Sequence, residues 1–155
     1  MKQSQPVFDE ERVRFEKNLM ITLQSDEYRY DPLKTIMFAF PWGKPNTPLE
    51  GIDRPRKWQI DFLNEIRDYY QQALKEGKTD DIFKKATASG RGPGKSALIG
   101  MLAWFFMSTR LGGSVIVTAN TEPQLMSKTM PEISKWFRMA VNSHWFQINA
   151  MSIRP

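Results

Sequence analysis

The chain has 155 residues, of which 41% are apolar and 25% are charged, values typical of one globular domain with a real core. It contains no cysteine, which excludes disulfides, thiolate metal sites and cysteine nucleophiles. The formal net charge of +5 favours polyanionic partners such as nucleic acid, although a solvated basic surface would give the same value. His144 is the only histidine, and its neighbours suggest neither a catalytic triad nor a metal site, so we interpret it as an ordinary surface or core residue.

Residues 1–34 are expected to form an N-terminal helical arm. The start of the chain is polar and charged, unlike a signal peptide, and Asp9 is a suitable N-cap for a helix over residues 8–24. The longest apolar run, residues 97–107, is too short to cross a bilayer. We therefore expect an intracellular, soluble protein with no membrane partner.

The apolar run over residues 35–40 predicts a short strand, and the prolines and glycines that follow predict an ordered loop. A helix is then predicted over residues 55–76. Pro55 suits its first turn and Gly77 its end, and apolar residues recur between them at helical spacing: Trp58, Phe62, Leu63, Ile66, Tyr70, Ala73 and Leu74.

The second half of the chain alternates between strand and helix patterns. The end of the segment 81–88 is expected to be a strand, residues 97–109 a helix buried on most sides, and residues 114–119 a β-branched strand. Pro131 is expected to begin another helix. This alternation predicts an α/β fold with a mostly parallel sheet.

Between the first of these strands and its helix lies a glycine-rich loop, residues 89–96. The common phosphate-loop pattern is G-x-x-x-x-G-K-[ST], and its end is matched here, whereas Ser89 stands in place of the first glycine. Glycines allow the unusual backbone angles that point several N–H groups at phosphates, and the following helix N-terminus attracts anions. The residues expected to bind a nucleoside triphosphate are Gly90, Gly92, Gly94, Lys95 and Ser96.

Two of these side chains have a specific expected role. Lys95 reaches the β- and γ-phosphates, and the Ser96 hydroxyl is the expected Mg²⁺ ligand. Arg91, inside the loop, would either stabilise the charge of phosphoryl transfer or simply face solvent, and its sequence position leaves both readings open. The alternative for the whole loop is a glycine-rich turn with a surface lysine.

Three stretches together resemble the N-terminal ATPase domain of the large terminase subunit, the DNA-packaging protein of tailed bacteriophages. The stretches are residues 40–59, which include Phe40-Pro41-Trp42-Gly43 and Arg54-Pro55-Arg56-Lys57-Trp58-Gln59, then residues 90–96, and then residues 117–125. Their order and spacing are more specific than any one motif.

The resemblance implies a P-loop NTPase fold, a three-layer sandwich whose partial domain covers residues 35–155. It implies ATP and Mg²⁺ as cofactors, catalytic roles for Arg91 and Lys95, and recognition of adenine by Gln59. Trp58 would stack on the base or anchor its helix. The implied partners are double-stranded DNA, the portal protein and the small terminase subunit, in a homo-oligomeric motor in the cytoplasm of a bacterial host.

One element of that family is missing. No apolar run ending in Asp-Glu follows residue 114, so we expect a sandwich truncated before its acidic strand, without the nuclease domain and with weak or no ATP hydrolysis by this chain alone. Two alternatives remain: another helicase-like P-loop ATPase, and a non-catalytic, truncated prophage remnant.

Overall fold

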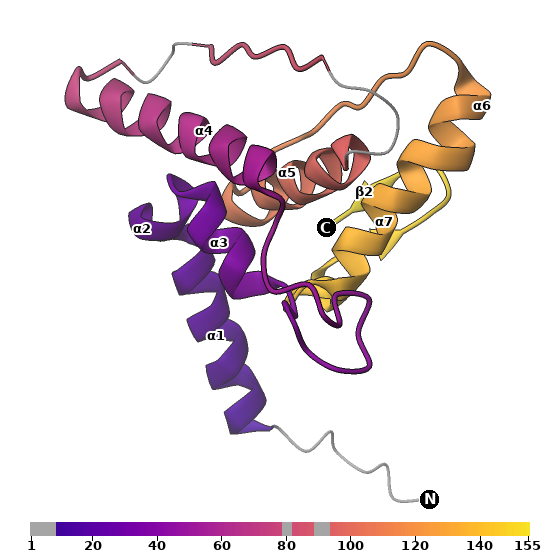
Figure 1. The fold of residues 1–155 in the computed structure, drawn as a ribbon. Helices are drawn as coiled ribbons and strands as arrows, with labels where there is room; N and C mark the ends of the chain where they lie inside the picture. Colours follow the sequence, from indigo (N-terminus) through magenta and orange to yellow (C-terminus); the bar gives the residue numbers. More distant parts are fainter. Residues whose placement is uncertain (1–8, 79–81, 89–93) are drawn as a thin grey trace, which may run out of the picture.

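A computed structural model describes residues 9–78, 82–88 and 94–155, and shows a mainly helical fold (Figure 1). The longer helices are α1 (Glu10–Gln24), α3 (Pro32–Ala39), α4 (Lys57–Lys75), α5 (Lys95–Thr109) and α7 (Met130–Met139). Shorter helices are α2 (Asp26–Arg29), α6 (Glu122–Gln124), a π-helical turn at Leu125–Thr129 and a 3₁₀ turn at Ser143–Trp145. Strands β1 (Gln147–Ile148) and β2 (Ile153–Arg154) form an antiparallel pair.

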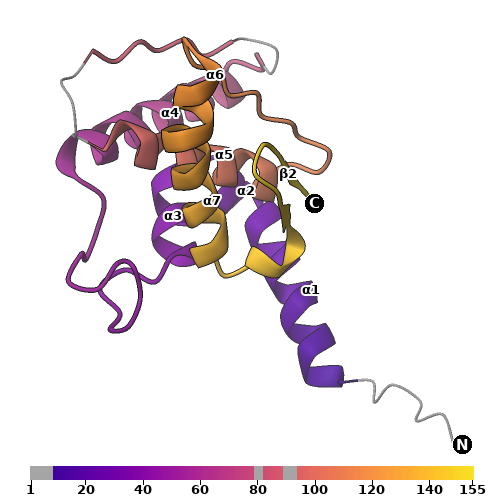
Figure 2. The same ribbon diagram turned by 90° about the vertical axis from the view of Figure 1, so that its right-hand side faces the viewer.

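The N-terminal helix α1 begins where the sequence predicts. The Asp9 carboxylate accepts hydrogen bonds from the backbone N–H groups of Glu11, at 3.1 Å, and Arg12, at 3.2 Å, which confirms its role as N-cap. The helix extends away from the rest of the molecule (Figure 2). Near its middle, Glu16 contacts His144, which places the only histidine at the surface beside a carboxylate.

Helix α3 replaces the strand expected at residues 35–40, and that prediction was wrong. The Asp31 side chain accepts a hydrogen bond from the Lys34 N–H at 3.1 Å, and Pro32 occupies the first turn. The Thr35 hydroxyl also donates to the carbonyl of Asp31, at 2.8 Å, inside the helix. A short apolar run fits a strand and a buried helix equally well, and here the capping residues determine which of the two forms.

The core lies where α3, α4, α5 and α7 meet. Helix α5 is the central element, and its Trp104 and Phe105 are fully buried, as is Phe137 of α7. The helices predicted at residues 55–76 and 97–109 are confirmed, with bounds within two residues of those predicted, and α5 is buried on most sides as expected. Among the described residues, none of the helices combines the length and the apolar character that crossing a bilayer requires.

The helix expected to begin at Pro131 starts earlier. Residues 122–139 are helical throughout, with the π-helical turn between α6 and α7. Pro131 has no N–H to donate, and just before it the Met130 N–H bonds to the carbonyl of Leu125, five residues back. The irregular turn therefore lies directly before the proline.

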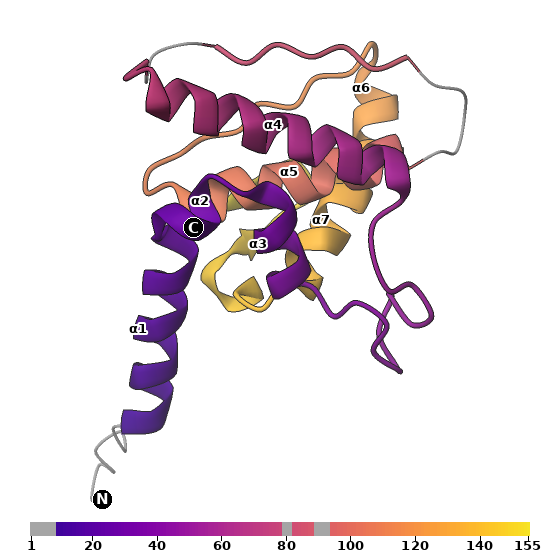
Figure 3. The same ribbon diagram turned by 60° about the vertical axis from the view of Figure 1, so that its left-hand side comes forward.

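The predicted mostly parallel α/β sandwich is contradicted by this structure. In the described part of the chain, the only paired strands are the antiparallel β1 and β2. Residues 82–88, which cross above α4 in Figure 3, and residues 113–119 have no regular secondary structure. Val115 and Val117 are partly buried while Ile116 between them is 88% exposed, so the strand-like alternation is present. A ladder also needs a neighbouring strand to accept its hydrogen bonds, and the described residues provide none.

Close packing of α5 on α7 gives a first testable prediction. A Cβ added at Gly100 would lie 2.6 Å from Cδ1 of Trp136. Gly100→Ala should lower the free energy of unfolding by about 1–3 kcal/mol, because overpacking outweighs the roughly 1 kcal/mol gain in helix propensity. Urea denaturation measures the change. The loss of unfolding free energy caused by Gly100→Ala should be smaller in a Trp136→Leu background. An equal loss in that background would show that Gly100 does not pack against Trp136.

Candidate phosphate-binding site

The N-terminus of α5 follows directly on Gly94, the last glycine of the predicted phosphate loop. Gly94 has a φ of 84°, in the left-handed region that glycine adopts without steric cost. The first helical hydrogen bond runs from the Leu98 N–H to the Gly94 carbonyl, at 3.1 Å, and no side chain caps the helix. The first turn of a helix leaves its N–H groups without acceptors inside the helix, so the start of α5 can donate to a ligand.

Gln59 connects this helix end to α4. Its Nε2 donates to the Gly94 carbonyl at 2.9 Å, across 35 positions in the sequence, and its Oε1 accepts from the Arg56 N–H at 2.9 Å. The side chain is only 4% exposed, so these bonds are shielded from water. Sequence reasoning predicted that Gln59 and the loop act together, and the structure brings them into contact. These two bonds use one of the two hydrogens and one of the two lone pairs of the Gln59 amide.

The close approach of the Gln59 side chain leaves no room for a Cβ at Gly94. A Cβ at this position would lie 2.8 Å from Nε2 of Gln59 and 3.9 Å from Cδ of Arg56. Both the backbone angle and the neighbouring amide therefore require glycine. The closeness is what allows the Gly94 carbonyl to accept from the Leu98 amide and the Gln59 amide at the same time.

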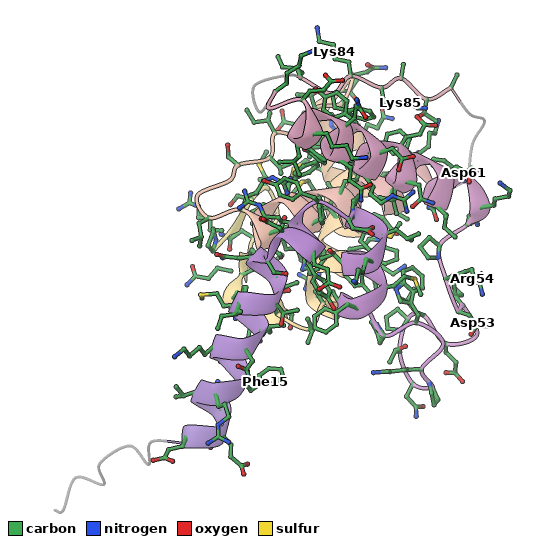
Figure 4. The ribbon with its side chains drawn as sticks, turned by 90° about the vertical axis from the view of Figure 1, so that its left-hand side faces the viewer. Phe15, Asp53, Arg54, Asp61, Lys84 and Lys85 are labelled. Atoms are coloured by element: carbon green, nitrogen blue, oxygen red, sulfur yellow. The ribbon has the colours of Figure 1, made fainter. Side chains whose placement is uncertain are left out.

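A cavity of about 250 Å³ opens beside Gln59 and Gly94. Its wall comes from the loop that leads into α4, from the starts of α4 and α5, and from α7. Figure 4 shows Arg54 on that loop. The lining includes two indole rings and four charged side chains, namely Trp42, Trp136, Arg54, Arg56, Lys135 and Glu132. Three positive charges against one negative charge make the cavity favourable for an anionic ligand.

The other predicted residues lie on a different side of the helix start. Trp58 and Lys95 line a second cavity of about 200 Å³, together with Lys85. Figure 4 shows Lys85 on the extended segment. Trp58 is partly buried and packs against the core, as expected of an anchor, whereas Lys95 is exposed. Ser96, in the first turn of α5, is partly buried. The remaining predicted site residues, Gly90, Arg91 and Gly92, lie outside the described residues.

Sequence reasoning missed the contribution of α7 to this site. Trp136, Lys135 and Glu132 come from a helix that begins 34 residues after the end of the loop, and no local pattern links them to it. The basic group at Arg54 and Arg56 was visible as a local concentration of charge. That concentration was the only available signal for the cavity.

The residues at this site could bind Mg²⁺ only together with the phosphates of a nucleotide. Among the described residues, no group of three or more acidic or histidine side chains is placed to hold an ion. Mg²⁺ commonly keeps several waters and binds through substrate phosphates with few protein ligands, so one hydroxyl at Ser96 is compatible with that chemistry.

Comparison with protein families, with curated proteins and with solved structures finds no match to this chain.

Proposed function

We propose that this chain binds ATP with Mg²⁺ at the N-terminus of α5, as the nucleotide-binding part of a DNA-packaging terminase ATPase. The observation that supports this most directly is the buried hydrogen bond from Gln59 to the Gly94 carbonyl. It fixes the start of a long buried helix against the helix that carries the expected base-recognition residue. The terminase assignment itself rests on the three sequence stretches described above.

The helix start suits the phosphate chain. Uncapped N–H groups and the helix dipole favour a negative charge at this position, and the Lys95 ammonium adds a full positive charge in the first turn. Arg54 and Arg56 add charge from the neighbouring loop. The helix N–H groups and Lys95 would hold the β- and γ-phosphates, and Mg²⁺ would arrive with the nucleotide and take the Ser96 hydroxyl as a ligand.

The cavity beside Gln59 suits the base. At about 250 Å³ it lies below the roughly 300 Å³ at which sites for whole drug-sized ligands begin, so it matches one ring system rather than the entire nucleotide. Trp42 and Trp136 provide ring surfaces, and Gln59 provides the remaining donor and acceptor. The base would lie in this cavity with the phosphates directed toward Lys95.

The proposal predicts binding with little turnover. Lys95 and Arg91 would neutralise phosphoryl charge, but in phosphoryl-transfer enzymes a separate residue orients the attacking water. No acidic pair follows residue 114 in this sequence to do so. In a complete motor, hydrolysis would drive double-stranded DNA into the capsid. For this chain we expect nucleotide binding and a turnover far below that of a complete motor ATPase.

Isothermal titration calorimetry with ATP and Mg²⁺ tests the site. Lys95→Ala should weaken ATP binding at least tenfold, about 1.4 kcal/mol, because a point charge next to the phosphates is lost. Lys75→Ala is the matched control, since Lys75 is an exposed lysine at the other end of α4. Absence of ATP binding by the unmodified chain, or equal affinity of the two variants, would refute the proposal.

A further inference from the structure

Another cavity lies at the opposite end of α4 and α5, near the C-terminal ends of α2, α4 and α5. Figure 3 shows these three helix ends on the same side of the molecule. Its volume is about 430 Å³, and its lining includes three tyrosines and three basic residues: Tyr30, Tyr69, Tyr70, Arg29, Lys78 and Arg110. No acidic side chain is among its lining residues. A cavity lined by cations and rings is suited to an anion that carries a planar group.

Arg110 is held rigidly in this wall. Its guanidinium stacks on the rings of Phe106, at 4.8 Å, and Tyr70, at 5.2 Å. Nη1 donates to the Thr109 hydroxyl at 2.8 Å, and Nη2 donates to the Arg29 carbonyl at 3.2 Å. Burial lowers the pKa of Arg110, and the nearby Arg29 charge adds to that effect. The charge is thus placed where water solvates it poorly.

Arg29 provides the second guanidinium. Its Nε is buried and has no hydrogen-bond partner among the described residues, and its guanidinium carbon lies 5.1 Å from the centre of the Tyr30 ring. Among the described residues, neither Arg29 nor Arg110 forms an ion pair with a carboxylate, whereas Lys78 pairs with Glu76 at 3.0 Å. Arg110 is therefore a poorly solvated positive charge in a cavity whose described lining provides no carboxylate, an arrangement that normally costs free energy.

Capping of helix ends explains only part of this arrangement. The bond from Arg110 to the Arg29 carbonyl satisfies the C-terminus of α2, as basic residues at helix ends often do. That bond uses one N–H of Arg110 and does not use the Arg29 side chain at all. Capping therefore does not account for the buried Nε of Arg29.

We infer that this cavity is a binding site for a phosphate monoester attached to a ring. Two guanidinium groups match the oxygens of a phosphate dianion through paired N–H donors. The rings of Tyr30 and Tyr70, whose centres are 5.9 Å apart, would contact the ring of the ligand. The site lies at the C-terminal end of α5, roughly 22 Å from the helix start at 1.5 Å per residue, and does not depend on the proposed ATP site.

Titration with phenyl phosphate and with inorganic phosphate tests the inference. Both titrations use the Lys95→Ala variant, so that binding at the N-terminus of α5 does not contribute. We expect both ligands to bind, phenyl phosphate more tightly, and Arg29→Gln to weaken phenyl phosphate binding at least tenfold. Arg67→Gln is the matched control, because Arg67 lies on α4 outside the cavity and pairs with Asp68 at 2.9 Å. The affinity of the Arg67→Gln variant for phenyl phosphate should stay within twofold of the value without this replacement.

A second variant covers the case in which Arg29→Gln fails to fold. Arg110→Lys keeps the charge but loses the planar fork of donors, and should also weaken binding tenfold. Equal affinities of the cavity variants and Arg67→Gln would overturn the inference. Binding of a single-stranded oligonucleotide alone, with a steep dependence on salt and no response to phenyl phosphate, would overturn it as well, because that behaviour indicates a general polyanion surface.

Discussion

Asn142→Ala is expected to lower the free energy of unfolding by about 3–4 kcal/mol, a large part of the 5–15 kcal/mol typical of a domain. Asn142 is fully buried. Its Oδ1 accepts from the indole N–H of Trp104 at 2.8 Å, and its Nδ2 donates to the Ser108 hydroxyl at 3.0 Å. Alanine would leave both partners buried without a hydrogen bond, at about 1–3 kcal/mol each, and would also leave a small cavity.

Urea denaturation measures this loss, and Asn149→Ala is the control. The control separates the loss of the buried hydrogen bonds of Asn142 from the general effect of removing an amide side chain. Asn149 is exposed and no side-chain hydrogen bond involving it is found among the described residues, so its replacement should change stability by less than about 0.5 kcal/mol. The m-value should be the same for both variants, because the unfolding remains two-state. If the two replacements have similar effects, Asn142 does not connect α5 to the chain after α7.

The helices were predictable because their signals are local. Asp9 caps α1, Gly77 follows α4 in a left-handed conformation, and α5 is apolar on almost every side. Each of these signals needs only the residues within a few turns. The interior that the helices build was predictable in outline for the same reason, since Trp104 and Phe105 lie in the centre of the longest apolar run.

The sheet failed as a prediction because strand pairing is not local. Residues 114–119 have the β-branched composition of a strand, and Val115 and Val117 alternate with Ile116 between the inside and the outside as a strand requires. Composition and alternation specify an extended chain. Only a second extended segment at ladder distance makes it a strand, and its presence cannot be deduced from the segment itself.

The sequence predicted only some of the residues that meet at the candidate site. The resemblance placed Gln59 and Gly94 together, and the structure puts Nε2 of Gln59 2.9 Å from the Gly94 carbonyl oxygen. It did not indicate that the amide would be engaged by the protein's own backbone. Nor did it indicate Trp42 or Trp136, because the approach of α7 to the loop depends on tertiary packing through Gly100.

Gly94→Ala should disrupt both the fold at the start of α5 and nucleotide binding. Alanine at a φ of 84° costs roughly 1–2 kcal/mol, and its Cβ, 2.8 Å from Nε2 of Gln59, would break a buried hydrogen bond worth about 1–3 kcal/mol. We expect a total loss of about 2–4 kcal/mol in urea denaturation. ATP affinity should fall more than in Lys95→Ala, by about a hundredfold, because the helix start itself is displaced.

Gly77→Ala isolates the backbone contribution to this effect. Gly77 has a φ of 66° at the end of α4, and a Cβ there would have no atom within 4 Å, so only the cost of the left-handed angle applies. The difference between the two variants measures the contact with Gln59. In a double-mutant cycle, Gln59→Ala should make Gly94→Ala less damaging, since the clash is removed. Equal costs for Gly77→Ala and Gly94→Ala, or strict additivity in the cycle, would show that Gln59 does not fix the helix start. The proposed nucleotide site would then lose its main structural support.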